Sequence, residues 1–292
     1  MSSPKQVLVC ELTANTAVNK EIFRLDFTWS GPAPRAGQFF LIRPERTSVF
    51  LGRPVSVFAW NGRRLSFLIA LRGRGTKELS MMYAGERAGL TGPLGNAWAD
   101  FAPPDLAVRG HGPAETAAWT NRRPDDGGLA GGGAVKKTAA KPIALVGGGI
   151  GIAPLAAFAA ELREGSFDCY AGFRTGFKDK EESSGLLGPA FANAAEKIIA
   201  AEDGRGGLKG RIAGFLEAAK YRAVYACGPE PMLRTAAAIC REAGVPCFVS
   251  IERRMACGTG ACLGCTVKTA GGGRRCCTEG PVFSAEDIYF DE

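Results

Sequence analysis

The sequence has few histidines, no clusters of basic residues and no long apolar runs, and each of these absences argues against a class of protein. It contains a single histidine, His111, and its Lys and Arg residues are scattered despite a formal net charge of +7. No apolar run reaches the roughly 18 residues needed to cross a bilayer, and the first residues lack the apolar core of a secretion signal. We therefore predict a cytoplasmic protein with no membrane span and no nucleic-acid partner. A hydrolase built on a Ser–His or Cys–His pair is disfavoured.

Cysteine, in contrast, is plentiful and unevenly placed. Half of the 10 cysteines lie close together near the C-terminus: Cys257, Cys262, Cys265, Cys276 and Cys277. In a reducing compartment such a group indicates metal ligands rather than disulfides. The others lie in apolar surroundings: Cys10, Cys169, Cys227, Cys240 and Cys247. All of these except Cys227 are interpreted as small buried hydrophobic residues.

The spacing of the C-terminal cysteines is typical of an iron–sulfur site. Cys257-x4-Cys262-x2-Cys265 with a distant fourth cysteine is the pattern of plant-type [2Fe–2S] ligation. The intervening glycines allow a tight loop and turn N–H groups toward sulfur. Zinc sites more often carry two CxxC pairs, and one is present here. Spacing alone leaves the fourth ligand open between Cys276 and Cys277.

The chain before this group divides into three predicted segments. Residues 1–101 contain short apolar runs separated by Gly/Pro turns, including an Asn61-Gly62 hairpin signal, and predict an antiparallel β-barrel. Residues 102–141 lack apolar periodicity and predict a linker or surface insertion. Residues 142–248 alternate strands with helices and predict a parallel-sheet α/β domain. Residues 249–292 form a small cysteine-rich module.

A glycine loop in the α/β segment indicates a phosphate site. Gly147, Gly148, Gly149 and Gly151 follow a predicted strand and precede a predicted helix. Bare backbone lets a phosphate approach, and the helix N-terminus offers unpaired N–H groups. The loop differs from the strict GxGxxG fingerprint, and tight strand–helix turns use glycine in any case. Its position between strand and helix favours a dinucleotide site.

The barrel segment carries a weaker phosphate signal. Arg53-Pro54-Val55-Ser56 begins a predicted strand, and Gly75-Thr76 occurs later. An arginine there can pair with a pyrophosphate, and the Ser56 hydroxyl can donate to it or to a flavin ring. Thr76 is equally well explained as a helix N-cap.

Several of these motifs occur in the order found in the ferredoxin–NADP reductase superfamily. They are Arg53-Pro54-Val55-Ser56, Gly92-Pro93-Leu94-Gly95-Asn96, the Gly147 loop, and Cys227-Gly228-Pro229-Glu230-Pro231-Met232. The cysteine-rich tail narrows the likeness. With it, the chain resembles the electron-transfer (PyrK-type) subunits of class 1B dihydroorotate dehydrogenases.

This resemblance implies three cofactor sites. FAD would be bound by Arg53, Pro54, Val55 and Ser56, by the strand Ile69, Ala70 and Leu71, and by Gly75 and Thr76. A nicotinamide dinucleotide, NAD(H), would be received by the Gly147 loop, Cys227 and Gly228. The [2Fe–2S] cluster would be held by Cys257, Cys262, Cys265 and, by family likeness, Cys277. No catalytic acid or base is expected.

The resemblance also implies a partner and a reaction. A dihydroorotate dehydrogenase catalytic subunit would join the chain in a hetero-oligomer, expected to be a heterotetramer. Electrons would pass from it through the cluster and FAD to NAD+ in pyrimidine biosynthesis. Alternatives are a subunit of a ferredoxin-dependent NADPH oxidoreductase or sulfide dehydrogenase, and a zinc-stabilised binding module.

Two departures from the family pattern leave questions open. Ile69-Ala70 stands where relatives carry a Tyr-Arg pair, so Arg72 or Arg74 would have to replace a flavin phosphate contact. The insertion at 102–141 is also longer than the family needs. NAD and NADP are not distinguished, because Arg174 after the second α/β strand could meet a ribose phosphate or could be an exposed structural residue.

Overall fold

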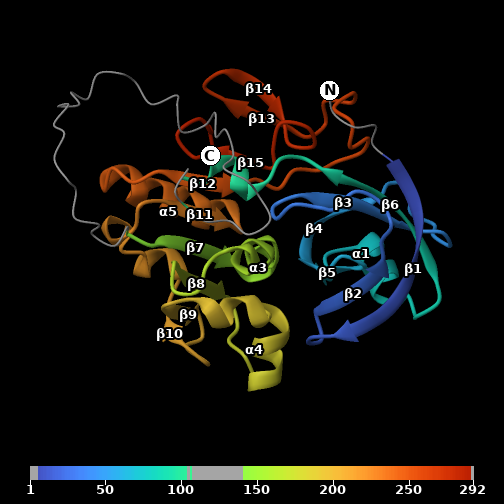
Figure 1. Ribbon diagram of the computed structural model, residues 1–292, viewed down its shortest axis with the longest axis horizontal. Coiled ribbons are helices and arrows are strands. Elements are labelled where there is room, and N and C mark those ends of the chain that lie inside the picture. Colours follow the sequence, from blue (N-terminus) through green and yellow to red (C-terminus); the bar gives the residue numbers. More distant parts are fainter. Residues whose placement is uncertain (1–5, 104–105, 107–140, 291–292) are drawn as a thin grey trace.

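The computed structural model describes residues 6–103, 106 and 141–290. Figure 1 shows a barrel and an α/β sheet side by side, with the C-terminal module lying across both. This arrangement confirms the predicted fold class. His111 and nearly all of the predicted insertion lie outside the described residues.

The N-terminal part is a closed antiparallel barrel with strand order β1-β2-β5-β4-β3-β6. Its strands are β1 (Gln6–Ala17), β2 (Ile22–Thr28), β3 (Phe39–Pro44), β4 (Arg53–Trp60), β5 (Arg64–Ala70) and β6 (Arg87–Leu94). Alternate β6 residues are buried, as expected for strands with one face in a core. The core contains Phe40 packed edge-to-face against Trp29 and Phe67, with ring centroids 4.9 and 5.6 Å away. Helix α1 (Arg74–Ser80) follows β5.

The second half is a seven-stranded sheet of order β10-β9-β8-β7-β11-β12-β15. All its strands run parallel except β15, which pairs antiparallel with β12. The strands are β7 (Ile143–Gly148), β8 (Phe167–Phe173), β9 (Lys197–Ala201), β10 (Leu208–Lys209), β11 (Val224–Cys227), β12 (Cys247–Ser250) and β15 (Val282–Ser284). Every residue of β7 is buried, because helices cover both faces of the sheet centre.

The sheet is accompanied by three α-helices and several 3-10 turns in the described residues. They are α3 (Ile152–Glu161), α4 (Lys180–Leu187), α5 (Glu230–Glu242), η2 (Gly149–Gly151), η3 (Pro189–Asn193), η4 (Ile212–Phe215) and η5 (Ala218–Lys220). A further 3-10 turn, η1 (Trp98–Phe101), follows the last barrel strand and connects the barrel to α3. Its fully buried Trp98 donates from the indole N–H to the Pro154 carbonyl at 3.2 Å.

The C-terminal module adds the hairpin β13 (Thr266–Thr269) and β14 (Gly272–Arg275) and then the sheet strand β15. Asn96, just after β6, ties this module to the barrel. Its side-chain amide donates to the carbonyls of Glu279 and Val282 at 2.9 and 2.8 Å and accepts from the Val282 N–H at 2.9 Å. The module is therefore fixed against both larger parts.

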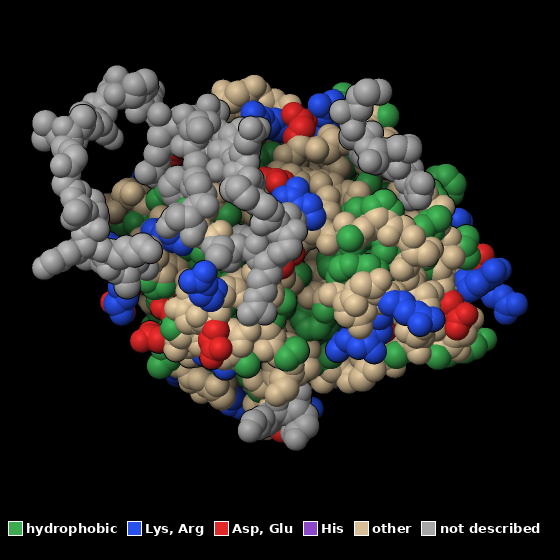
Figure 2. Space-filling model, in the orientation of Figure 1, with side chains coloured by type: hydrophobic (Ala, Val, Ile, Leu, Met, Phe, Trp, Pro, Cys, Tyr) green, Lys and Arg blue, Asp and Glu red, His purple; other side chains and the backbone are tan. Residues whose placement is uncertain are grey.

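Two surface observations accompany the fold. In Figure 2, Lys and Arg side chains are scattered over the visible face rather than gathered in one stretch. No helix in the described part of the chain is long and apolar enough to span a membrane.

Candidate functional site

A cleft of about 610 Å³ opens where the barrel, the α/β sheet and the C-terminal module meet. β4 and β5 form one wall, and the start of α3 with the end of β11 forms the opposite one. The segment that leads from β12 toward the cysteines closes it. Predicted site residues supply much of the lining: Arg53, Pro54, Val55, Ser56, Ile69, Ala70, Thr76 and Cys227.

The other predicted cofactor residues do not line the cleft. These are Leu71, Gly75, Gly147, Gly148, Gly149, Gly151 and Gly228. Gly75 is nonetheless adjacent, because a Cβ placed on it would lie 2.6 Å from Arg53 Nε. The glycine loop reaches the cleft through its neighbours Ile150, Ala153 and Pro154.

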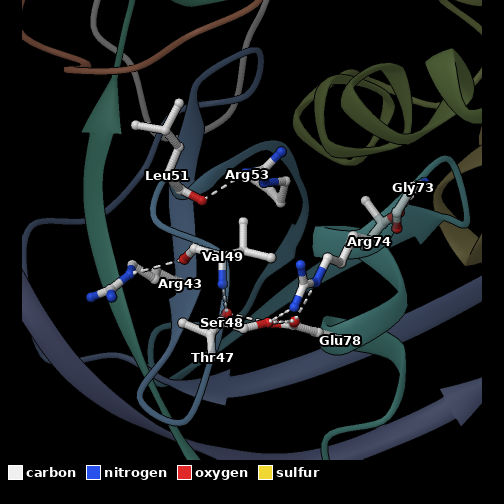
Figure 3. Close-up of polar contacts among 10 residues, drawn as sticks. Arg43, Thr47, Ser48, Val49, Leu51, Arg53, Gly73, Arg74 and Glu78 are labelled. Carbon is white, nitrogen blue, oxygen red and sulfur yellow. Dashed lines mark hydrogen bonds and ion pairs between the residues drawn. The ribbon is translucent and has the colours of Figure 1, made fainter.

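Arg53 has the properties expected of a residue that binds an anion. Its Nη2 donates to the Leu51 carbonyl at 2.8 Å, as Figure 3 shows. Its Nε is buried and has no hydrogen-bond partner within the described residues. A buried donor left unpaired costs free energy, and a bound phosphate would satisfy it. The absence of a side chain at Gly75 gives the guanidinium its space.

The Thr76 hydroxyl is occupied locally. It accepts from the backbone N–H groups of Arg72 and Gly73 at 2.9 and 3.2 Å, and it donates to the Gly73 carbonyl at 3.0 Å. The N-cap of α1 is Gly73 and Thr76 is the third residue of the helix, so the interpretation of Thr76 as the N-cap is wrong. Its hydroxyl stabilises the beginning of α1 from within the first turn, and it has little capacity left for a cofactor.

Arg72 and Arg74, the two arginines that could replace the flavin phosphate contact made by the Tyr-Arg pair of relatives, have different surroundings. Arg74 Nη2 donates to the Ser48 hydroxyl at 2.5 Å, and its Nε pairs with Glu78 at 3.5 Å (Figure 3). Hydrogen bonds from Ser48 and Thr47, with Arg74 nearby, lower the pKa of Glu78. Arg74 thus braces the β3–β4 loop against α1. Arg72, in contrast, lines the cleft.

The glycine loop brings the ends of β7 and β11 into close contact. A Cβ on Gly151 would lie 2.3 Å from the Cys227 carbonyl, so only glycine fits there. Gly149 has open space but a φ of +55°, which favours glycine for a conformational reason. The loop therefore sets α3 directly behind the cleft.

Cys227, Ser250 and Glu252 all line the cleft. Burial raises the pKa of the Cys227 thiol; the Glu252 charge adds to this rise, and a hydrogen bond with Ser250 opposes it. Burial also raises the pKa of Glu252, with Arg72 acting in the opposite direction. Cys227 is thus a neutral thiol that presents a small polarizable surface to whatever binds here.

The first two cysteines of the C-terminal group lie at the surface. Cys262 is exposed and Cys257 is half-buried. Hydrogen bonds from the Thr259 hydroxyl and from the N–H groups of Cys262 and Thr259 lower the pKa of Cys257 to about 5. Its thiolate form, the form that binds metal, is therefore stabilised.

The second two cysteines are buried. The Cys277 N–H donates to Cys265 Sγ at 3.5 Å, and both residues are nearly inaccessible. Cys276 Sγ instead faces the Ile251 carbonyl at 3.7 Å, and burial raises the pKa of its thiol to about 12. These contacts favour Cys277 over Cys276 as the fourth ligand.

Across residues 6–103, 106 and 141–290, no three His, Cys, Asp or Glu side chains are grouped as a metal site requires. The chemistry of the donors nevertheless fits an iron–sulfur cluster, because three thiols share one loop, a fourth follows the β13–β14 hairpin, and backbone N–H groups already point at two of the sulfurs.

Sequence reasoning missed the segment after β12 as part of the cleft. Its lining residues are Ser250, Ile251, Glu252, Arg253, Arg254 and Met255. The only signal in the sequence was the position of this segment, which connects β12 of the α/β sheet to the first cysteine of the C-terminal group. Arg253 also pairs with Glu230 at 3.1 Å, which holds the segment against α5.

Residues 252–289 match the family model described as the iron-sulfur cluster binding domain of dihydroorotate dehydrogenase B. The chain is also 34% identical over 258 residues to the dihydroorotate dehydrogenase B (NAD(+)) electron transfer subunit of Clostridium acetobutylicum, covering 88% of this chain and 87% of that one. The chain belongs to this family of electron transfer subunits. A second member, from Caldanaerobacter subterraneus subsp. tengcongensis, is 31% identical and covers 95% of this chain and 96% of its own.

Solved structures agree on the fold. An NADH-dependent reduced ferredoxin-NADP oxidoreductase matches with a TM-score of 0.72 at 24% identity, covering 98% of this chain and 91% of that chain. A ferredoxin NADP+ reductase from Neisseria gonorrhoeae matches with a TM-score of 0.56 at 13% identity, covering 82% and 92%. At these sequence identities the two matches show a shared fold and nothing about function.

Proposed function

We propose that this chain is the electron-transfer subunit of an NAD-dependent dihydroorotate dehydrogenase B. In this proposal it passes electrons from a catalytic subunit, through a [2Fe–2S] cluster and FAD, to NAD+. Family membership over most of the chain supports the assignment. The match of the cysteine module to the cluster-binding domain of the same enzyme supports the metal site.

One observation carries the proposal furthest. The segment 250–255 lines the cleft, and it continues directly into the loop that begins at Cys257. The same short stretch of chain would therefore contact a flavin in the cleft and hold the first ligand of a cluster. This connection suits a protein whose task is to keep two redox groups close together.

The protein's own residues would bind and orient the cofactors. Arg53 would pair its free Nε with a flavin phosphate, and Arg72 would add a second cation from the same wall. The Gly147 loop would receive the dinucleotide pyrophosphate at the start of α3. Bound FAD supplies the exchange between two-electron hydride chemistry and one-electron chemistry. The neutral Cys227 thiol would pack against the reacting rings without taking a proton.

The cysteine assignment completes the proposal. Cys257, Cys262, Cys265 and Cys277 would hold the cluster, while Cys276 stays in the core. We further propose a cytoplasmic hetero-oligomer, a heterotetramer with the catalytic subunit. In domain terms, residues 1–101 would bind FAD, 142–248 would bind NAD and 249–292 would bind the cluster, with 102–141 as an insertion.

The test is reconstitution with a catalytic subunit of dihydroorotate dehydrogenase B. We expect the mixture to reduce NAD+ at the expense of dihydroorotate, and the catalytic subunit alone to fail. Failure of the mixture, when both proteins carry their cofactors, would contradict the proposal. Reduction of NADP+ by reduced ferredoxin in place of dihydroorotate would instead assign the chain to the ferredoxin-dependent branch.

A further inference from the structure

A second cavity, of about 620 Å³, lies between the outer wall of the barrel and helix α4. The β1–β2 turn and side chains of β2, β4 and β5 form its barrel side, and α4 with the residues flanking it forms the other side. We call this cavity the α4 groove. Among the described residues, none lines both the α4 groove and the cofactor cleft. On β4, for example, Ser56 lines the cleft, whereas Phe58 lines the groove.

The barrel side of the α4 groove carries an arginine in a fixed orientation. Arg24 Nε donates to Asp26 Oδ1 at 2.9 Å, and its Nη2 donates to the Ser66 hydroxyl at 3.2 Å. The guanidinium carbon also lies 5.8 Å from the centre of the Phe58 ring, within the range of a cation–π contact. Asp26 and Ser66 stand opposite each other on β2 and β5 and are only 6% and 2% exposed. The guanidinium is therefore positioned by the protein itself.

This guanidinium keeps donors that no protein group uses. The Arg24 side chain is 32% exposed, and within the described ranges the structure records no hydrogen bond for its Nη1. Arg64 lies beside it, with its Nε 4.0 Å from Asp26 Oδ2 and its side chain 53% exposed. That distance is longer than a hydrogen bond. Two guanidinium groups thus share one carboxylate, and both retain the planar N–H edges that suit phosphate.

The acidic residues on the α4 side are already hydrogen-bonded within the chain. Glu182 accepts from the Asn19 side-chain amide at 2.7 Å and from the Lys178 N–H at 2.8 Å. Asp179 Oδ1 accepts from the Glu182 N–H at 2.8 Å. The exposed side chain of Lys178 also lines the groove, and in the described part of the chain it has no recorded hydrogen bond or ion pair. The groove therefore offers cations with spare donors, whereas its carboxylates have partners.

We propose that the α4 groove binds a small phosphorylated molecule, with its dianionic phosphate held by Arg24 and Arg64 from the barrel and by Lys178 from the α4 side. The rest of the molecule would lie against the apolar lining formed by Val18, Phe58 and Pro189. The volume is within the range of about 300–1,000 Å³ of small-molecule sites. This site is additional to the proposed function and does not depend on it. Its occupant would contact the barrel and α4 together.

The test is calorimetric titration of the full chain, carrying FAD and in excess NAD+, with phenyl phosphate as the probe. We expect a Kd on the order of 0.1–1 mM, and no detectable heat with phenol, which lacks the phosphate. Arg64→Ala and Lys178→Ala should each weaken phenyl phosphate binding about tenfold, the worth of a charge-assisted hydrogen bond. Higher salt should weaken binding in the wild type. Absence of binding up to about 10 mM, or displacement of the probe by NAD+, would overturn the inference.

The matched control is Arg63→Ala, which removes the exposed arginine next to Arg64 that does not line the groove. It should leave the Kd of phenyl phosphate unchanged. Thermal unfolding gives a second measurement, because a ligand that binds only the folded chain raises its unfolding midpoint. Phenyl phosphate should raise the midpoint in the wild type and in Arg63→Ala, and much less in Arg64→Ala. Equal weakening by Arg63→Ala and Arg64→Ala, or equal binding of phenol and phenyl phosphate, would contradict a phosphate site here.

Discussion

The β4–β5 wall of the cleft and the neighbouring cysteine loop differ in what holds them in shape. The wall belongs to a closed barrel, and Val57, Phe67 and Ile69 are buried in its core. The loop from residue 256 to 264 has no regular structure, and Cys262 and Leu263 are exposed. Leu263 even adopts a φ of +58°, which is unusual for a residue with a side chain.

This difference suggests how each part depends on its cofactor. Packing forms the wall whether or not a flavin is present. The loop has few buried contacts of its own, so a bound cluster would supply much of its order, as in other small metal modules. Flavin binding and cluster binding should therefore be separable by mutation, and the following predictions test that separation.

The largest effect is expected from Cys262→Ser. Loss of this exposed thiol should remove the cluster and lower electron transfer to the catalytic subunit by about 100-fold or more, since ligand loss couples to loop order. Reduction of the flavin by NADH should be partly retained. Iron, sulfide and flavin contents report the loss of the cluster, and stopped-flow kinetics report the rate at which NADH reduces the flavin. A Cys276→Ala control should keep its cluster; loss of FAD along with iron in Cys262→Ser would argue against separate sites.

Arg53→Ala should act on the wall instead. We expect FAD affinity to fall about 10- to 100-fold, because a buried charge-assisted phosphate contact is lost. Flavin retained after dialysis reports the change. The matched control is Arg74→Ala, which removes an arginine bound to Ser48 and Glu78 and should leave FAD content near that of the wild type. Equal losses of FAD in the two variants would contradict the role of Arg53 as a phosphate-binding residue.

Asn96→Ala should loosen the cysteine module from the barrel. Its side-chain amide makes three hydrogen bonds to residues 279 and 282. Leaving those groups unpaired should cost about 2–3 kcal/mol of unfolding free energy. Denaturant titration followed separately through cluster and flavin absorbance should show the cluster signal shifting more. A uniform shift of both signals would mean that the two parts unfold as one unit.

The smallest effect is expected from Glu161→Gln, where α3 contacts the barrel. Burial raises the pKa of Glu161 to about 7, while its Oε1 accepts from the Ala36 N–H at 3.3 Å. The folded state therefore holds a proton that the unfolded chain releases near its ordinary pKa, so this residue lowers stability as pH rises from about 4.5 to 7. The amide variant should be roughly 1–3 kcal/mol more stable than the wild type at pH 8 and equal to it near pH 4. If the free energies of unfolding of the wild type and Glu161→Gln differed by the same amount at every pH from about 4 to 8, the raised pKa of Glu161 would be contradicted.

Sequence reasoning anticipated the elements with strong local signals. The predicted Asn61-Gly62 hairpin turn does connect β4 to β5. Weak signals were harder to interpret. β9 contains Lys197 and alanines, and β10 has two residues, so neither carries a clear periodicity.

The parts of the site that escaped prediction depend on tertiary contacts. The pairing of β15 with β12 joins segments distant in sequence through only three residues. The choice between Cys276 and Cys277 depends on which thiol faces Ile251, which spacing does not encode. Likewise, Arg72 and Arg74 are equivalent in sequence, and only the Ser48–Glu78 contacts separate them.

The most direct test of the central claim is the cofactor content of the protein purified without oxygen. Iron, acid-labile sulfide and flavin are quantified beside an absorption spectrum. We expect about two irons and two sulfides per chain, as for a [2Fe–2S] centre, together with about one FAD. A colourless protein that contains one zinc, or neither sulfide nor flavin, would contradict the account.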